Sequence, residues 1–212
     1  MLGDLFSSRQ IKNSEELQKK LENSLKKVNA IYAKDIYAKF KVLKGVDEIG
    51  GVLLNIQHVY NIIDIISAEI SPNLMRFVLV LDNIDDPLEA QNITKMSGIA
   101  FHKASDMMGD LKKSDLTVDI VLCNKPLDKI LADVINLISA VKKDWSVTKH
   151  QIFREYKETG NQYKVAEKLG ITQQAVSKNL DNMNWREMDE METSLNNLLK
   201  MIILEHKRKG LC

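Results

Sequence analysis

The sequence is poor in the residues that cross-link or interrupt a chain. It has two cysteines, Cys123 and Cys212, and three prolines among 212 residues. Two cysteines cannot build the disulfide framework of small secreted proteins, and they fit a reducing compartment. No apolar run approaches the ~20 residues that span a bilayer, and the start MLGDLFSSRQ lacks the apolar core of a signal peptide. We therefore expect a cytoplasmic protein without a membrane partner, in which long helices are uninterrupted by proline.

The chain also lacks an excess of charge of either sign. Thirty Lys and Arg residues face 29 Asp and Glu residues, for a net charge of +1. Any nucleic-acid binding must therefore come from local placement of charge. The phosphate-binding patterns G-x-x-x-x-G-K-[ST] and G-x-G-x-x-G are absent, as is any His/Cys cluster at zinc spacing. These absences exclude nucleotide sites built on those patterns and zinc-finger sites.

One stretch, residues 162–182, has the pattern of two short helices joined by a tight turn. Gly170 falls where a left-handed residue ends the first helix, and Thr172 falls where an N-cap begins the second. The order A-x-x-L-G-I-T-x-x-x-V-S is similar to the helix-turn-helix of sigma-factor region 4 and of bacterial repressors. In that motif the second helix presents polar side chains to the major groove of DNA. The same pattern also fits an ordinary helical hairpin that serves as a protein docking surface.

The polar face of the second helix supplies the candidate DNA contacts. Gln173, Gln174 and Ser177 are candidates for reading base edges, because glutamine can pair bidentately with adenine. Phosphate contacts position a protein on DNA without reading its sequence, and the basic candidates for them are Arg154, Lys164, Lys168 and Lys178. Residues 144–186 contain seven Lys and Arg against five Asp and Glu. Because this excess is small, we expect a homodimer that binds two half-sites of double-stranded DNA.

Upstream of this stretch, the hydrophobic pattern alternates between strands and helices. Strands are expected at 40–43, 76–81 and 116–123, with a short one before Gly3, and helices at 14–33, 52–70, 97–111 and 126–142. Gly50 and Gly51 are expected in a tight turn that follows the carboxylate pair Asp47-Glu48. The near-continuous apolar strand at 76–81 predicts burial on both faces of the sheet. The alternation predicts an α/β (α+β) fold, a mixed sheet of ferredoxin-like or palm-like type with helices, plus an all-α helix-turn-helix domain.

A last long helix is expected over residues 185–209, with an apolar stripe along one side. That stripe must pack against the α/β part or against a second subunit. We therefore divide the chain into an α/β domain at 1–143, a helix-turn-helix unit at 144–186 and a C-terminal amphipathic helix at 187–212 for dimerisation or docking.

Several short motifs occur in the order typical of one family. Gly3-Asp4 precedes Ser8-Arg9, and F-K-V-L-K-G-V-D-E-I, R-F-V-L-V-L, G-I-A-F-H-K-A and the helix-turn-helix stretch follow in turn. This order resembles the SatD family, whose members show G-D-x-x-x-S-R, a G-D-E-F-Q type turn, R-F-x-x-G and G-x-A-F-x-x-A. The resemblance spans nearly the whole chain and implies an α/β domain joined to a C-terminal DNA-binding unit. The chain departs from the pattern at Val46, which separates Gly45 from the acidic pair, at Ile49, and in the missing glycine of the R-F strand.

The α/β part is also similar to the palm-type domains of nucleotide cyclases. In those domains an Asp after the first strand and an acidic pair on a later turn hold two metal ions. The resemblance makes Asp4, Asp47 and Glu48 candidate metal ligands, with Mg²⁺ as the cofactor that carboxylate oxygens would select. The alternative function is therefore a metal-dependent nucleotide-binding or cyclase-like enzyme. The same residues equally fit a solvated pair of carboxylates in a turn.

Together these patterns favour a dimeric DNA-binding transcriptional regulator rather than an enzyme. In this interpretation no cofactor is required and no catalytic residue is assigned. The α/β domain would assemble the protein or sense a small-molecule ligand, and the helix-turn-helix would read DNA.

Overall fold

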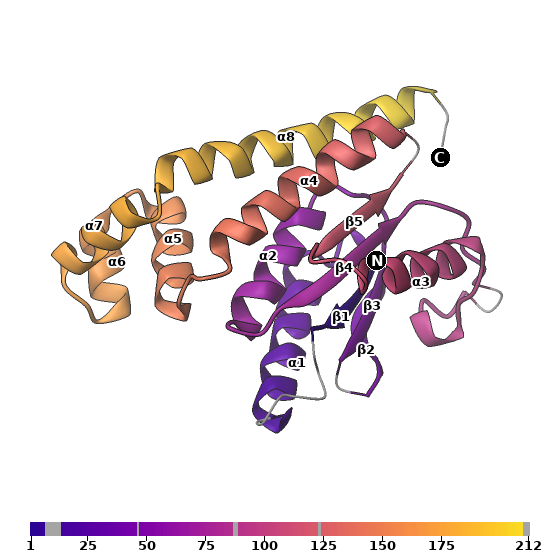
Figure 1. The fold of residues 1–212 in the computed structure, drawn as a ribbon, viewed down its shortest axis with the longest axis horizontal. Helices are drawn as coiled ribbons and strands as arrows, with labels where there is room; N and C mark the ends of the chain where they lie inside the picture. Colours follow the sequence, from indigo (N-terminus) through magenta and orange to yellow (C-terminus); the bar gives the residue numbers. More distant parts are fainter. Residues whose placement is uncertain (7–13, 46, 87–88, 123, 210–212) are drawn as a thin grey trace.

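The computed structural model describes residues 1–6, 14–45, 47–86, 89–122 and 124–209, with backbone alone for 204–209. Its N-terminal part is built on a five-stranded sheet in the order β2-β3-β1-β4-β5 (Figure 1). The strands are β1 (Leu2–Leu5), β2 (Ile36–Lys44), β3 (Glu48–Leu53), β4 (Met75–Val80) and β5 (Val118–Val121). β4 and β5 run parallel, and the other neighbouring strands run antiparallel. The predicted mixed sheet of an α/β fold is thereby confirmed.

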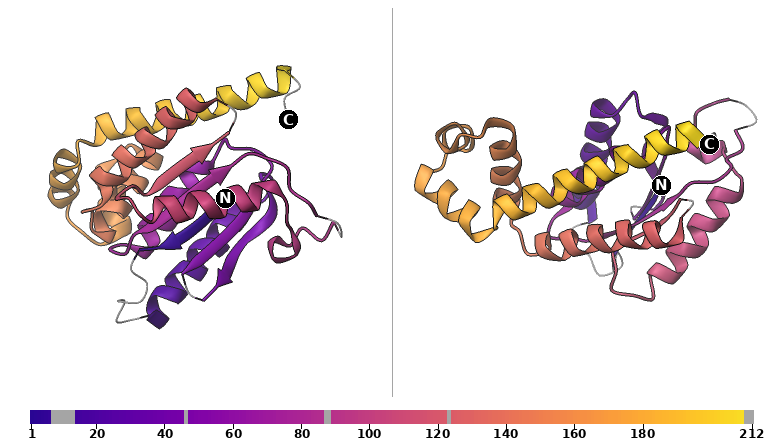
Figure 2. Two further views of the ribbon diagram at one scale, coloured as in Figure 1. Left: turned by 45° about the vertical axis from the view of Figure 1, so that its right-hand side comes forward. Right: turned by 90° about the horizontal axis from the view of Figure 1, so that it is seen from above.

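Helices cover both faces of this sheet. One face carries α1 (Ser14–Ile31), α2 (Val59–Ile70) and α4 (Lys125–Lys142), and the other carries the 3-10 turn η2 (Ile93–Lys95) and α3 (Ile99–Leu111). Figure 2 shows α1 and α3 on opposite sides of the sheet. Phe77 and Leu79 of β4 pack into the main core, whereas Val78 packs against α3. The predicted burial of this strand on both faces is therefore confirmed.

The prediction of a helix from residue 52 and of a glycine turn before it is wrong. Residues Glu48–Leu53 form β3, which pairs with both β1 and β2, and the helix α2 begins only at Val59. Both glycines lie inside β3, at positions where the neighbouring side chains leave no room for a Cβ atom. A Cβ on Gly51 would lie 2.5 Å from the Phe40 ring on β2, closer than packed atoms come. Strand pairing therefore overrides the turn signal of the glycine pair.

The C-terminal part consists of four helices. They are α5 (Val147–Thr159), α6 (Gln162–Leu169), α7 (Gln173–Asn182) and α8 (Trp185–Lys209). α5, α6 and α7 form a small cluster at one end of the molecule, and α8 runs back from it along α4 (Figure 1). The apolar stripe of α8 is buried in the same hydrophobic core as the sheet, through Met188, Leu195, Leu199 and Ile202. This stripe is therefore covered within the chain, by residues of the α/β part and of the other C-terminal helices.

Candidate nucleic-acid interface

The helix-turn-helix begins and ends its helices with local caps. The Asn161 side chain accepts hydrogen bonds from the backbone N–H groups of Tyr163 and Lys164, and so starts α6. Gly170 ends α6 with a φ of 66°, in the left-handed region that favours glycine. Thr172 Oγ1 then accepts a hydrogen bond of 3.1 Å from the backbone N–H of Ala175 and starts α7. The predicted turn chemistry at Gly170 and Thr172 is confirmed.

The interior of this unit fixes the angle between the helices. Val165 and Ala166 of α6 are buried against Val176 and Leu180 of α7, and α5 closes the cluster with Ile152. Because one side of α7 is fully occupied by this core, its opposite side is left to solvent.

The solvent side of α7 is a shallow polar hollow. Its lining consists of Gln173, Gln174, Ser177, Lys178, Asp181 and Asn182. Gln174 and Lys178 are exposed, and among the described residues no hydrogen bond or ion pair uses their side chains. The Gln173 amide donates a hydrogen bond to the side-chain oxygen of Gln162, so α6 holds its orientation. The three predicted base-reading residues thus lie on one surface, together with Lys178.

The remaining predicted phosphate contacts are placed unequally. Lys164 is exposed beside the N-terminus of α6, and Arg154 is partly exposed on α5. Lys168 instead forms an ion pair with Glu155, whose side chain is 11% exposed, and so joins α6 to α5. Because the charge of Lys168 is paired within the unit, Lys164, Lys178 and Arg154 are the better candidates for phosphate contacts.

Of the candidate metal ligands, Asp4 and Glu48 lie in the sheet, and Asp47 lies in the turn before β3. Asp4 of β1 is directly opposite Glu48 of β3 and Arg76 of β4, so these three side chains share one face of the sheet. The Asp4 carboxylate is buried and lies 2.7 Å from the ammonium of Lys112. The Asp47 carbonyl accepts a hydrogen bond from the backbone N–H of Leu5.

This arrangement does not fit a two-metal site. Within the described ranges, no group of three or more His, Cys, Asp and Glu side chains could hold a metal ion. Lys112 and Arg76 already supply positive charge beside the buried Asp4 carboxylate. We therefore derive no chemistry through a metal ion here.

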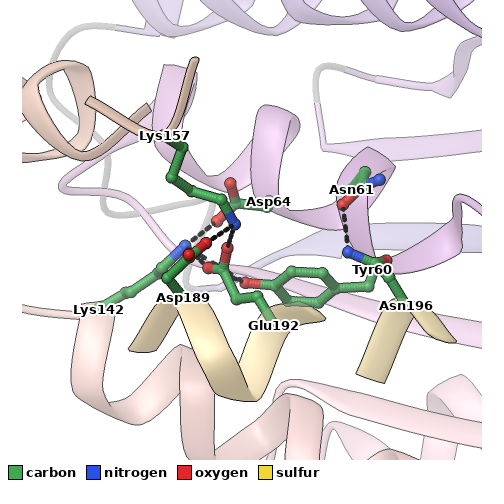
Figure 3. Close-up of polar contacts among 8 residues, drawn as sticks. All are labelled: Tyr60, Asn61, Asp64, Lys142, Lys157, Asp189, Glu192 and Asn196. Carbon is green, nitrogen blue, oxygen red and sulfur yellow. Dashed lines mark hydrogen bonds and ion pairs between the residues drawn. The ribbon is translucent and has the colours of Figure 1, made fainter. Parts of the chain in front are cut away.

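Sequence reasoning missed a buried ion-pair network that joins the three parts of the chain (Figure 3). Lys142, at the end of α4, binds both Asp64 of α2 and Glu192 of α8. Glu192 also accepts hydrogen bonds from the hydroxyl of Tyr60 at 2.6 Å and from the ammonium of Lys157 on α5 at 2.7 Å. Four helices, α2, α4, α5 and α8, are therefore held by one set of charges.

The electrostatics of the network favour its charged state. Burial by itself lowers the pKa of Lys142, but the attraction of Asp64 and Glu192 outweighs it and raises that pKa above its ordinary value. The pKa of Lys157 is raised in the same way, against burial, by Glu192 and Asp189. Burial, followed by the charges of Asp64 and Glu192, raises the pKa of Tyr60 well above its usual range. Both lysines thus stay charged and Tyr60 stays protonated at neutral pH.

A sequence signal for this network exists in the stripe of α8. Glu192 lies between Met188 and Leu195 on the buried face, where a carboxylate is costly unless it is paired. That position predicts a buried cation nearby, but which lysine supplies it depends on the fold.

No helix of the described part is long and apolar enough to cross a membrane. Among protein families, the SatD family matches the chain over residues 1–187. No curated protein and no solved structure matches it.

Proposed function

The chain belongs to the SatD family, and from this premise we propose that it is a cytoplasmic DNA-binding transcriptional regulator. The observation that carries the proposal is the solvent side of α7, an N-capped helix with a continuous polar surface and a rigid buttress behind it. A major groove about 12 Å wide admits such a helix. In this proposal Gln174 pairs with a base edge, with Gln173 and Ser177 beside it, and Lys178, Lys164 and Arg154 contact phosphates.

A homodimer is the second part of the proposal. The stripe of α8 is used within the chain, so pairing needs another surface. On α4 the side chains of Ile130 and Leu137 are both 55% exposed and that of Val141 is 46% exposed. With the partly buried Val134 they follow the a and d spacing of a helix–helix seam. We assign a second copy to this seam, because two half-sites about 34 Å apart compensate for the weak charge of one unit.

The DNA-binding proposal is tested by fluorescence anisotropy with genomic and random double-stranded fragments. Replacing Gln174 and Lys178 together by alanine removes one base-reading and one phosphate-binding side chain. We expect an affinity loss of at least about tenfold, since a good bidentate base contact contributes about 1–3 kcal/mol. The Lys178→Ala change alone should reduce the slope of log affinity against log salt concentration by about one.

A matched control changes a similar pair on α1, away from α7 (Figure 1). Asn23 and Lys26 are exposed on α1, and replacing both by alanine removes the same amount of charge. This control should keep the affinity and the salt slope. Unchanged affinity in the α7 double variant would show that α7 is not the recognition helix.

A further inference from the structure

A cavity of about 670 Å³ lies at the joint between the α/β part and the helix-turn-helix. Its walls come from α2, α4 and the loop at 71–74, and His150 of α5 forms part of another side. The volume falls within the range of about 300–1,000 Å³ found for small-molecule sites. Such sites commonly lie where two domains meet.

Three polar side chains in the wall have unused hydrogen-bonding capacity. They are Ser67 on α2, Ser139 on α4 and His150 on α5, all partly buried. In the part of the chain that the structure describes, no hydrogen bond uses their side chains. Burial lowers the pKa of His150 to about 4, helped by the nearby charges of Lys142 and Arg154 and opposed by those of Asp64 and Glu192. At neutral pH its imidazole is therefore neutral and offers one donor and one acceptor.

The charges around the cavity cancel. Lys142 is already bound to Asp64 and Glu192, so it offers no free positive charge to a ligand. Lys143 and Asp115, which are exposed at the wall, have opposite signs. The rest of the lining is mainly apolar and includes the rings of Phe6 and Phe77. This chemistry disfavours phosphates and other ions and favours an uncharged molecule with a ring.

We propose that this cavity binds an uncharged, largely apolar, ring-containing small molecule through hydrogen bonds to Ser67, Ser139 and His150, and that binding changes the affinity for DNA. The second clause rests on the proposed function. The cavity wall includes residues on both sides of the junction between the α/β part and the helix-turn-helix, which lies between the end of α4 at Lys142 and the start of α5 at Val147.

Contacts at the joint provide the physical link. The hydroxyl of Ser71 donates a hydrogen bond of 3.3 Å to the carbonyl of Trp145. The Trp145 ring packs against His150 and Phe153, with ring centres 5.4 and 5.2 Å apart. A ligand shifts an equilibrium only through its difference in affinity for the two states. An occupant that touches His150 and the α4 wall favours one placement of α5, and through it one placement of α6 and α7.

The experiment uses four compounds of similar size with the full chain. Indole and benzamide are neutral, whereas benzoate and benzylammonium are charged, and ligand-observed NMR titration measures their binding. We expect the neutral pair to bind in the millimolar range or tighter, and the charged pair at least about tenfold more weakly, because burying an unpaired charge is costly.

Variants place the binding in this cavity. Ser139→Phe fills the cavity and should weaken the neutral probes by about tenfold or more, whereas Ser194→Phe, at an exposed position of α8, should leave them unchanged. Circular dichroism checks that both variants fold. If Ser139→Phe does not fold, Ser67→Ala combined with Ser139→Ala removes both hydroxyls and should weaken benzamide by about tenfold.

The outcomes separate the cavity from its effect on DNA. Absence of neutral-probe binding, equal binding of all four compounds, or full binding to the cavity variant overturns the site. DNA affinity is then measured with and without saturating benzamide, and a change of at least about threefold is expected. An unchanged affinity overturns the regulatory clause. A chain that binds no DNA at all refutes the proposed function, while the NMR titration still decides whether the cavity is a binding site.

Discussion

Removing the ammonium of Lys142 tests whether the buried network holds the three parts of the chain together. The Lys142→Met change keeps the volume of the side chain and leaves Asp64 and Glu192 without their shared cation. The side chains of Lys142 and Glu192 are 7% and 5% exposed, so water cannot replace the lost partner easily. Breaking one partner of such a buried pair typically costs about 3–5 kcal/mol of unfolding free energy.

The structure moves this expectation to the lower end of that range. Glu192 keeps Lys157 and the hydroxyl of Tyr60 as partners, and the side chain of Asp64 is 33% exposed. We therefore expect a loss of about 3 kcal/mol, or a melting temperature about 6–12 °C lower for a chain of this size. Urea unfolding followed by circular dichroism measures the loss, and thermal unfolding checks it.

Lys129→Met is the matched control on the same helix. Lys129 pairs with Asp133, but the two side chains are 68% and 51% exposed. Exposed pairs contribute about 0–1 kcal/mol, so this control should remain close to the native stability. If Lys142→Met loses no more stability than Lys129→Met, the network does not fasten the helices and the reasoning fails.

Three further predictions concern pH, backbone and assembly. The folded-state pKa of His150, about 4, lies below the ordinary value of 6.5, because the folded protein disfavours the charged imidazole. The stability that the neutral His150 contributes is therefore complete above pH ~6.5 and is lost as the pH falls toward ~4. This loss amounts to at most about 3 kcal/mol of unfolding free energy. His150→Gln should flatten that part of the curve of unfolding free energy against pH, and an unchanged curve would contradict the shift. Gly170→Ala should destabilise the folded protein by about 1 kcal/mol, because the φ of Gly170 is 66°. Gly109→Ala, in the helix α3 with open space around it, should instead stabilise it by about 0.5–1 kcal/mol. Urea unfolding should show changes of opposite sign for the two variants, and changes of the same sign would refute the argument. Leu137→Glu should convert the proposed dimer to monomer in analytical ultracentrifugation while Met201→Glu, at a 58% exposed position of α8, should not; dissociation by the second change alone would move the interface to α8.

The sequence was sufficient for the parts of the fold that local interactions determine. The end of α6 and the start of α7 depend on Gly170 and Thr172, whose hydrogen bonds reach at most a few residues along the chain. Such caps act wherever the segment lies in the fold, and so they are visible in one stretch of sequence. The α/β alternation is also local, because each buried strand or amphipathic helix carries its own period.

The error at β3 arose where local and long-range preferences disagree. Residues 52–70 are rich in apolar side chains, and the short apolar run at the start, residues 52–54, does not by itself distinguish a buried strand from a helix. The strand is decided by pairing with β1 and β2 and by the close contact between Gly51 and the Phe40 ring. These contacts join residues of three different strands, so the hydrophobic periodicity of one segment cannot reveal them.

The network escaped prediction for a related reason. Tyr60 and Glu192 are separated by 132 positions, and Lys142 and Tyr60 by 82. A carboxylate in the stripe of α8 indicates that a buried partner exists, but the identity of Lys142 follows only from the crossing of α4, α2 and α8. The candidate DNA surface differs, because Gln173, Gln174, Ser177 and Lys178 lie within two turns of one helix.

The internal ion pairs also bear on how the helix-turn-helix can meet DNA. Of the seven basic residues at 144–186, Lys157 is bound to Asp189 and Glu192, and Lys168 is bound to Glu155. Both pairs hold helices together, so neither lysine is available to a phosphate without loosening the unit. The charge left for DNA is therefore smaller than the sequence count indicates, and affinity through phosphate contacts falls with each lost contact. Under the proposed function, a single copy would for this reason bind DNA weakly, and two copies paired through the exposed seam of α4 would double the contacts without altering the charges that keep each copy folded.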